Sequence, residues 1–255
     1  MSTIELYPRD YTAQAAAGHL TELAKKASIA ELASWPLYFA SAMKAIARSL
    51  LESGSVCIRP EPPFRLASGR LSPVYVDCRR LISFPQIRRL ITTEFARIIR
   101  EKIGVAQVEI IAGGETAGIP YAAWLAAELE LPLIYVRKQP KGHGKSSQIE
   151  GVLSPGQRVV LVEDLVTDGG SKLLFKRGIE AAGGLVANCL CVFEYRSRRA
   201  GLAAARQGLA AQGLKLFSLC DWDELLELAQ AESDVGQVLD FLGDPDGWSR
   251  AHEPG

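Results

Sequence analysis

The hydrophobic pattern predicts helices at both ends of the chain. Ala13–Leu32 spaces its leucines as one face of a helix does, and Pro36 suits the first turn of a second helix that should end near Leu51. From Asp221 onward, the spacing of apolar residues again predicts helices that pack on the core. Neither region carries a motif of its own, so core packing is the default interpretation, with a subunit interface as the alternative for the first region.

Between these ends, buried strands are predicted to alternate with amphipathic helices. Apolar stretches predict strands at residues 108–112, 133–136, 159–162, 185–193 and 214–219. Apolar residues at helical spacing predict helices at residues 85–103, 119–129 and 172–182. This alternation indicates an α/β fold with a doubly wound parallel sheet.

A different pattern precedes this alternation. Three prolines at positions 60, 62 and 63 exclude a helix, and short apolar stretches at 64–66 and 74–76 predict two strands. The loop between the strands, Ser68–Pro73, is either a plain hairpin connection or a segment that contacts a ligand.

The stretch Val159–Lys172 carries the clearest chemical signal. Glu163 and Asp164 stand where the apolar strand should end, and the glycine-rich turn Thr167–Ser171 leads into the next helix. Ligands of open α/β sheets bind at the carboxyl ends of strands, and a glycine-rich turn entering a helix points N–H groups at an anion. The stretch therefore predicts a ligand with both hydroxyls and a phosphate, such as a ribose 5-phosphate. An acidic turn whose glycines serve only the turn is the alternative.

Two further loops follow predicted strands. Gly113–Gly118 also joins a strand to a helix, and its glycines serve either an anion or close packing of helix on sheet. The loop from Arg137 to Gln148 combines glycines with the cations Arg137, Lys138, Lys141, His143 and Lys145. Such a loop is either solvated or closes over an anionic substrate and excludes water from it.

Composition narrows the class of protein. The 255 residues are 48% hydrophobic, and 29 basic residues balance 29 acidic ones, which argues against nucleic-acid binding driven by overall charge. We expect no signal peptide and no membrane span. The five cysteines are scattered without a Cys-x-x-Cys motif, so we expect reduced thiols, a cytoplasmic location and no dedicated metal cage.

Four motifs together carry a family resemblance. Residues 160–171 resemble the phosphoribosyl-pyrophosphate (PRPP) signature of type I phosphoribosyltransferases. With Phe64–Arg79, Ile111–Pro120 and Tyr135–Gly144, the region from Ser55 to Tyr195 is similar to the orotate phosphoribosyltransferase family. The resemblance implies the type I phosphoribosyltransferase fold, a parallel sheet with a small hood and helical extensions. The expected boundaries are an N-terminal extension at 1–54, the core with its hood at 55–220, and a C-terminal extension at 221–255.

The resemblance also implies a reaction. Orotate and PRPP would give orotidine 5′-monophosphate and pyrophosphate, a step of de novo pyrimidine (UMP) biosynthesis. Magnesium would bind mainly through PRPP and pyrophosphate oxygens. A homodimer is expected, in which the basic loop reaches the partner subunit's site. The alternatives are a non-catalytic regulator that binds PRPP, and a phosphoribosyltransferase for a purine base.

Site roles follow residue by residue from the same resemblance. Lys141, His143 and Asp164 would be catalytic. Substrate contacts are expected in the loop after the strand at 133–136, in the PRPP signature, in the hood and near the end of the strand at 185–193. These residues are Arg137, Lys138, Lys141, His143, Glu163, Asp164, Leu165, Val166, Thr167, Asp168, Gly169, Gly170, Ser171, Ser68, Gly69, Arg70 and Tyr195.

Within these expected roles, Glu163 and Asp164 would bind the ribose hydroxyls, and Thr167–Ser171 the 5′-phosphate. The basic loop would contact pyrophosphate.

Three positions depart from the family pattern. Ala67 stands where many members have Lys, Tyr195 where many have an Arg that contacts orotate, and Asp168 where Thr or Ala is usual. A carboxylate beside a phosphate is unfavourable unless it points away. Arg79 and Arg196 are the alternative sources of a cation for the carboxylate of orotate.

Overall fold

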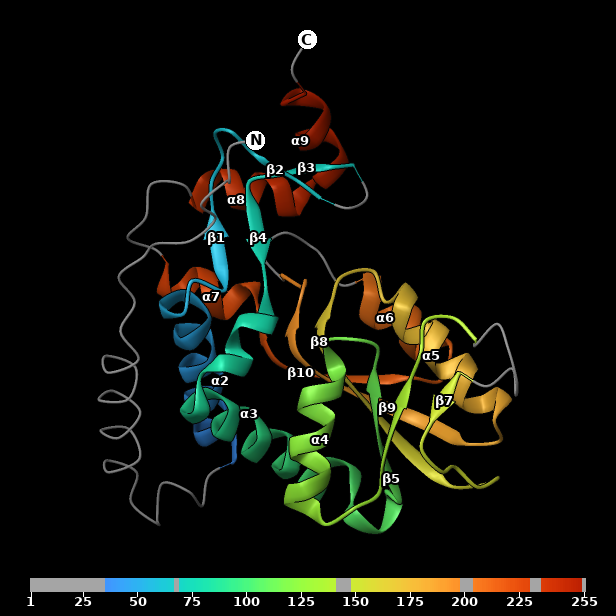
Figure 1. Ribbon diagram of the computed structural model, residues 1–255. Coiled ribbons are helices and arrows are strands. Elements are labelled where there is room, and N and C mark those ends of the chain that lie inside the picture. The colour runs from blue at the N-terminus through green and yellow to red at the C-terminus, as the bar shows by residue number, and fades with distance from the viewer. Residues whose placement is uncertain (1–34, 67–68, 141–147, 198–203, 230–234, 254–255) are drawn as a thin grey trace. The chain divides into compact units, whose positions relative to one another are not determined.

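The computed structural model describes residues 35–66, 69–140, 148–197, 204–229 and 235–253 (Figure 1). The chain divides into two compact units. The sheet unit comprises residues 88–196 and 203–221, and the terminal unit comprises residues 1–87, 197–202 and 222–255. Residues 55–87 thus group with the terminal segments, whereas the predicted boundaries placed them with the sheet. The helix predicted at Ala13–Leu32 lies outside the described residues.

Six strands form the sheet of the sheet unit, in the order β10-β9-β8-β5-β6-β7. Five are parallel to their neighbours and β7 is antiparallel to β6, so the predicted doubly wound parallel sheet is confirmed with one antiparallel edge strand added. The strands are β5 (Ile110–Gly114), β6 (Leu133–Val136), β7 (Ile149–Glu150), β8 (Arg158–Val166), β9 (Leu185–Glu194) and β10 (Lys215–Asp221).

Helices cover both faces of this sheet. The helices are α3 (Pro85–Ile98), α4 (Gly118–Leu129), α5 (Gly170–Ala181) and α6 (Ala204–Ala211), with short helical turns at Ile99–Ile103 and Val105–Gln107. α4 packs on β5, β6 and β8, whereas α5 packs on β6, β8 and β9 and α6 on β10 (Figure 1). The buried side chains of α5 and α6 form one core with alternate strand residues, among them Cys189 and Cys191.

The terminal unit is built from helices and two antiparallel strand pairs. Its elements are α2 (Trp35–Glu52), β1 (Val56–Ile58), β2 (Phe64–Arg65), β3 (Leu71–Ser72), β4 (Val74–Val76), a 3-10 helix (Cys78–Ser83), α7 (Trp222–Leu228), α8 (Val235–Gly243) and α9 (Pro245–Ala251). The strands predicted at 64–66 and 74–76 do not pair with each other: β2 pairs with β3, and β4 pairs with β1. α7 packs against α2, and α9 packs against α8 and β3.

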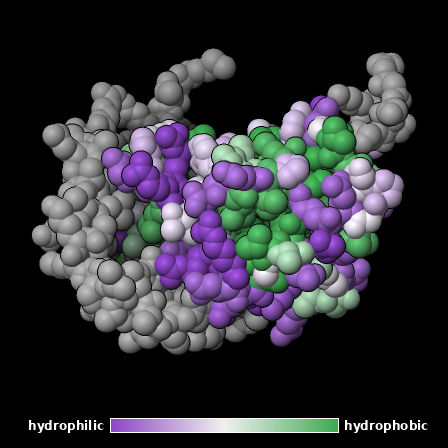
Figure 2. Space-filling model, turned by 90° about the horizontal axis from the view of Figure 1, so that it is seen from below, coloured by the Kyte–Doolittle hydropathy of each residue, from purple (hydrophilic) through white to green (hydrophobic). Residues whose placement is uncertain are grey.

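The two ends of the parallel strands differ in character. In the described part of the chain, the exposed large apolar side chains belong to Val105, Leu133, Val152 and Leu185. Leu133 and Leu185 begin β6 and β9, and Val105 precedes β5, so these residues mark the amino ends of strands. Figure 2 shows apolar residues gathered among hydrophilic ones on the face it draws. The predicted site residues of the sheet unit lie at the opposite, carboxyl ends of strands or in the loops that follow them. Across the described residues, no helix is long and apolar enough to span a membrane.

Candidate active site

The chain connections that leave β5 and β8 run in opposite directions along the sheet. From β5 the chain crosses through α4 to β6 on one side, and from β8 it crosses through α5 to β9 on the other. Ligands of open α/β sheets bind where successive connections diverge in this way. The β5–β8 pairing ends at Gly113 and Val162, whereas β8 and β9 stay paired to Val166 and Glu194.

This continued pairing corrects the predicted end of the central strand. Glu163 and Asp164 lie inside β8 and not beyond it, because β9 supplies partners along the whole stretch. Neighbouring residues of a strand point to opposite faces of the sheet. Glu163 is buried on the side of α5, and Asp164 is half-buried on the alternate side. The two carboxylates therefore have different surroundings.

Glu163 forms a buried ion pair with Lys172 in the first turn of α5. The Lys172 Nζ lies 2.7 Å from Glu163 Oε2, and both side chains are 7% exposed or less. Burial raises the pKa of Glu163 despite the attraction of Lys172. For Lys172, burial opposes the charge, but the Glu163 carboxylate raises its pKa overall. A weak signal for this pair is present in the sequence, since a cation in the first turn of a helix opposes the helix dipole and needs compensation.

The glycines after β5 make room for Glu163. A Cβ at Gly114 would stand 2.1 Å from Glu163 Oε1, and one at Gly118 would stand 2.3 Å from the Val162 carbonyl oxygen. Glu163 Oε1 has no hydrogen-bond partner within the described structure. Close packing, one of the two interpretations of the Gly113–Gly118 loop, is thus a sufficient reason for these glycines.

The turn after β8 forms a helix N-terminus with an exposed approach. Thr167, Asp168 and Gly170 are exposed, while Gly169 is buried with φ +85° against Leu209 of α6. The first N–H groups of a helix lack intrahelical acceptors and can bind an anion. Asp168 Oδ1 already accepts one of them, the Gly170 N–H at 2.9 Å. Its carboxylate therefore points to the start of the helix, where its negative charge interacts favourably with the helix dipole.

The described ends of the basic loop are held together. The Arg137 N–H donates to the Gln148 carbonyl at 2.8 Å, and the Gln148 side-chain amide donates to the Arg137 carbonyl at 2.9 Å. The Lys138 N–H donates to Glu115 Oε2 at 2.7 Å, which joins this loop to the one after β5. The sequence did not single out Gln148 or Glu115. Lys141 and His143 lie outside the described residues.

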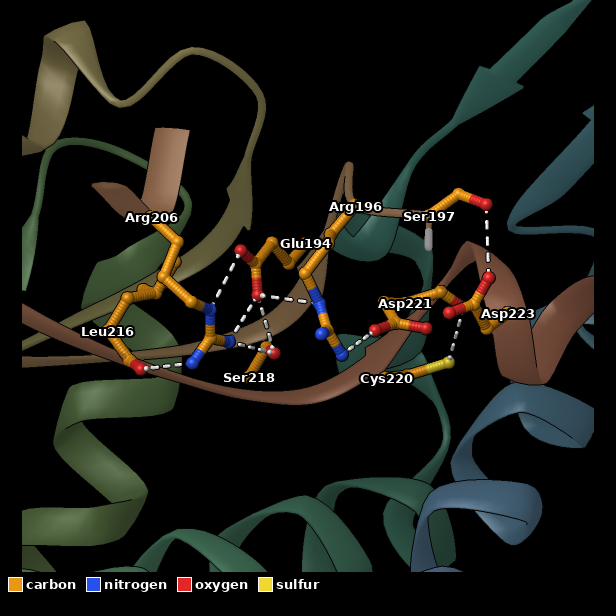
Figure 3. Close-up of polar contacts among 9 residues, drawn as sticks. All are labelled: Glu194, Arg196, Ser197, Arg206, Leu216, Ser218, Cys220, Asp221 and Asp223. Carbon is orange, nitrogen blue, oxygen red and sulfur yellow. Dashed lines mark hydrogen bonds and ion pairs between the residues drawn. The ribbon is translucent and has the colours of Figure 1, made fainter. Parts of the chain in front are cut away.

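The carboxyl ends of β9 and β10 carry a charged network (Figure 3). Glu194 lies between Arg206 and Arg196, and Arg196 pairs with Asp221. The Ser218 hydroxyl donates to Glu194 Oε2 at 2.9 Å. Glu194 and Asp221 are 1% and 0% exposed. Burial opposes the charge of Arg206, yet Glu194 raises its pKa. Arg196, one alternative cation for orotate, thus has carboxylate partners of its own.

Tyr195 lies beside the start of the turn that follows β8. Its N–H donates to the Val166 carbonyl at 2.8 Å, and its ring packs edge-on against Phe193 with ring centres 5.6 Å apart. The structure thus brings Tyr195 next to the end of β8. Leu165 is half-buried and Val166 is buried beside it.

The predicted substrate contacts of the hood, Ser68, Gly69 and Arg70, belong to the terminal unit. Gly69 has φ +87°, which favours glycine, and Arg70 pairs with Asp246. Arg79, the other alternative cation, donates to Asp77 and to the Tyr75 hydroxyl. Ser68, like Ala67, lies outside the described residues.

The metal-ligating potential of the described residues is small. Their His, Cys, Asp and Glu side chains form no group of three or more that could hold a metal ion. A magnesium ion bound mainly by phosphate oxygens and water does not need such a group. The half-buried carboxylate of Asp164 is compatible with such an arrangement.

The chain is similar to known phosphoribosyltransferases. A family model described as a phosphoribosyl transferase domain matches residues 83–206. The orotate phosphoribosyltransferase of Dinoroseobacter shibae is 44% identical over 209 residues, 80% of this chain and 91% of that protein. The enzyme of that name from Cereibacter sphaeroides is 46% identical over 214 residues, 82% of this chain and 90% of that protein. The crystal structure of orotate phosphoribosyltransferase from Aeropyrum pernix superposes with a TM-score of 0.63 at 31% identity, covering 74% of this chain and 99% of that one.

Proposed function

The chain belongs to the orotate phosphoribosyltransferase family and transfers ribose 5-phosphate from PRPP to orotate, and we propose that the carboxyl ends of β5 and β8 hold PRPP during this reaction. The products are orotidine 5′-monophosphate and pyrophosphate, a step of pyrimidine (UMP) biosynthesis. The observation that carries the site is the half-buried Asp164 near the end of β8, with the partly exposed turn Thr167–Gly170 leading from that strand into α5. An acid for hydroxyls beside amides for a phosphate matches the two ends of a ribose 5-phosphate.

The residues of β8 and of the turn that follows it bind the ribose and its 5′-phosphate. Asp164 accepts hydrogen bonds from the ribose hydroxyls, because its carboxylate is on the half-exposed side of the strand. The N–H groups and hydroxyls of Thr167–Ser171 bind the 5′-phosphate. Leu165 and Val166 contribute backbone to this stretch. The predicted contact of Glu163 with a hydroxyl remains a prediction, since its carboxylate is paired with Lys172 in this structure.

The basic loop binds pyrophosphate. Arg137, Lys138, Lys141 and His143 stabilise the negative charge that grows on pyrophosphate as the bond to ribose C1 lengthens. Support comes from the clamp at Arg137 and Gln148, which fixes the point where the loop leaves the sheet. When bound, magnesium neutralises phosphate charge, and Asp164 is the described side chain that fits beside it.

Orotate is proposed to contact Ser68, Gly69, Arg70 and Tyr195. This assignment rests on the family likeness and on the partly exposed side chain of Arg70, whose partner Asp246 is itself exposed. Arg196 is a weaker candidate than Arg70 for the carboxylate of orotate, because two buried carboxylates already neutralise it.

A homodimer with a shared site is also proposed, on the same family likeness. Mixing a Lys141→Ala chain with an Asp164→Asn chain, each impaired on its own, should restore part of the activity, because hybrid dimers pair an intact loop with an intact acid. Verified hybrids that stay inactive would reject the shared site.

One assay tests the reaction itself. Orotate consumption is followed spectrophotometrically with PRPP and magnesium, and purine bases replace orotate in parallel reactions. We expect turnover with orotate alone. Turnover with a purine base would favour the purine alternative, and PRPP binding without any turnover would favour a regulator.

A further inference from the structure

Helix α9 contacts the segment that carries Arg70. The Leu71 N–H donates to the Ser249 hydroxyl at 2.8 Å, and Arg70 Nη2 lies 2.7 Å from Asp246 Oδ1. Leu71 and Ser249 are 4% and 6% exposed, so their hydrogen bond is buried. The family model ends at residue 206 and therefore assigns nothing to this helix.

The segment needs such support because its own strand pairing is small. β2 and β3 pair through two residues each, and a two-stranded hairpin is at best marginally stable alone. The Leu66 N–H donates to the Arg70 carbonyl at 2.8 Å, which closes the turn around Gly69. The Leu71 N–H is satisfied on the other side by Ser249, so α9 covers the open edge of β3.

Helix α9 is itself firmly held. Asp244 caps its first turn by accepting the Gly247 N–H at 2.9 Å. Trp248 is buried and packs edge-on against Phe241 of α8, with ring centres 5.7 Å apart. Ser249 is thus presented by a capped helix with a buried aromatic anchor.

We propose that α9 positions the base-contacting segment, with Ser249 fixing the backbone at Leu71 and Asp246 orienting the Arg70 guanidinium. The inference rests on the proposed contact of Arg70 with orotate. Ser249 and Asp246 are positioning residues and do not touch the substrate. Ser249 contributes more to this positioning, because its hydrogen bond is buried. The Arg70–Asp246 ion pair is weak, because its side chains are 39% and 66% exposed.

The test separates orotate from PRPP. In Ser249→Ala we expect the KM for orotate to rise roughly fivefold, the scale of one lost hydrogen bond, while the KM for PRPP stays within about twofold. Ser249→Thr keeps the hydroxyl and should restore the KM. Asp246→Asn should raise the KM for orotate about twofold. Arg250→Ala, an exposed position of the same helix, is the matched control and should leave both constants unchanged.

The contrary outcomes are distinct. Equal rises in both KM values, or a lower melting temperature with both KM values unchanged, would show that α9 only stabilises the fold. If Ser249→Ala does not fold, Asp246→Asn decides, and an unchanged KM for orotate overturns the proposal. An active wild type with insensitive variants rejects this inference alone, whereas a wild type that neither binds nor consumes orotate rejects the proposed function as well.

Discussion

The ends of three neighbouring strands in the sheet unit carry carboxylates, and β8 uses its carboxylate differently from β9 and β10. At the ends of β9 and β10, Glu194 and Asp221 are buried and each pairs with an arginine. At the end of β8, Asp164 is half-buried and leads into an exposed helix start. An acid at the end of a strand is therefore not by itself a ligand site. It is a better candidate where the side chain is partly exposed and a helix N-terminus lies beside it.

We call the ends of β9 and β10, with their buried and paired carboxylates, the closed end, and the end of β8 with Asp164 the open end. Glu163 resembles the closed end, although it is adjacent to Asp164. Its carboxylate is 4% exposed and paired with Lys172, so strand alternation separates it from its neighbour. The comparison thus predicts that changes at Glu163, Lys172, Glu194 and Arg206 affect stability first, and that changes at Asp164 and Asp168 affect PRPP first.

The largest expected effect is at Lys172. Lys172→Met leaves the Glu163 charge buried and uncompensated, which should lower the free energy of unfolding by about 4 kcal/mol at neutral pH. Glu163→Gln with Lys172→Met removes both charges and should recover most of the loss. Urea unfolding of the wild type, the single and the double variant measures this. A double variant as unstable as the single one would contradict a charge-based cause.

The same variant should show a particular pH dependence. Burial already raises the pKa of Glu163 from its usual value of 4.5, and loss of Lys172 removes an interaction that lowers it. A carboxyl with a raised pKa in the folded state destabilises the fold as pH rises from the unfolded value through the folded one. Lys172→Met should therefore lose less stability, relative to wild type, at pH 5 than at pH 8. Melting curves at the two pH values check this, and an equal loss at both would count against it.

The next effect tests the closed end of β9. Arg206→Ala removes the main partner of buried Glu194 and should lower the free energy of unfolding by about 3 kcal/mol. This loss of stability is at the low end of the range for a buried ion pair because the Arg206 side chain is 38% exposed. The KM for PRPP of the folded fraction should stay within about twofold of wild type. A large rise in that KM with unchanged stability would assign the network to the substrate site.

The open end is tested at Asp164. Asp164→Asn keeps the shape but weakens hydrogen bonds to a charged group, worth about 1.5–3 kcal/mol, so kcat/KM for PRPP should fall by roughly 10-fold to 100-fold. The melting temperature should stay close to that of wild type. Steady-state kinetics and a thermal melt measure the two quantities, and wild-type kinetic constants would reject the role.

Sequence patterns predicted the sheet and the motif at Val159–Lys172, but they did not predict this difference between strand ends. The apolar stretch at 159–162 predicted a strand, yet polar Glu163 and Asp164 hid its extension to Val166, which depends on pairing with β9. The edge strand β7 and helix α6 escaped prediction because one has only two residues and the other is short. The Arg206–Glu194 and Arg196–Asp221 pairs join residues 12 and 25 positions apart, a proximity that no local pattern encodes.

The smallest effect concerns Asp168, which stands at the open end but bears the wrong charge for a phosphate. Its Oδ1 accepts the Gly170 N–H, and an asparagine oxygen can keep that hydrogen bond, so Asp168→Asn should preserve the turn. Without the negative charge, the 5′-phosphate meets less repulsion at the helix N-terminus. A charge there is worth about 0.3–1 kcal/mol, so the KM for PRPP should fall roughly twofold to fivefold at low salt.

The difference should shrink at high salt, because exposed charges are screened. Glu180→Gln, an exposed acid near the other end of α5, is the matched control and should leave the KM for PRPP unchanged. A higher KM for PRPP in Asp168→Asn would mean that the carboxylate itself assists binding, for instance through a metal-bound water. The open end of β8 would then use both of its accessible acids, and the contrast with β9 would be sharper still.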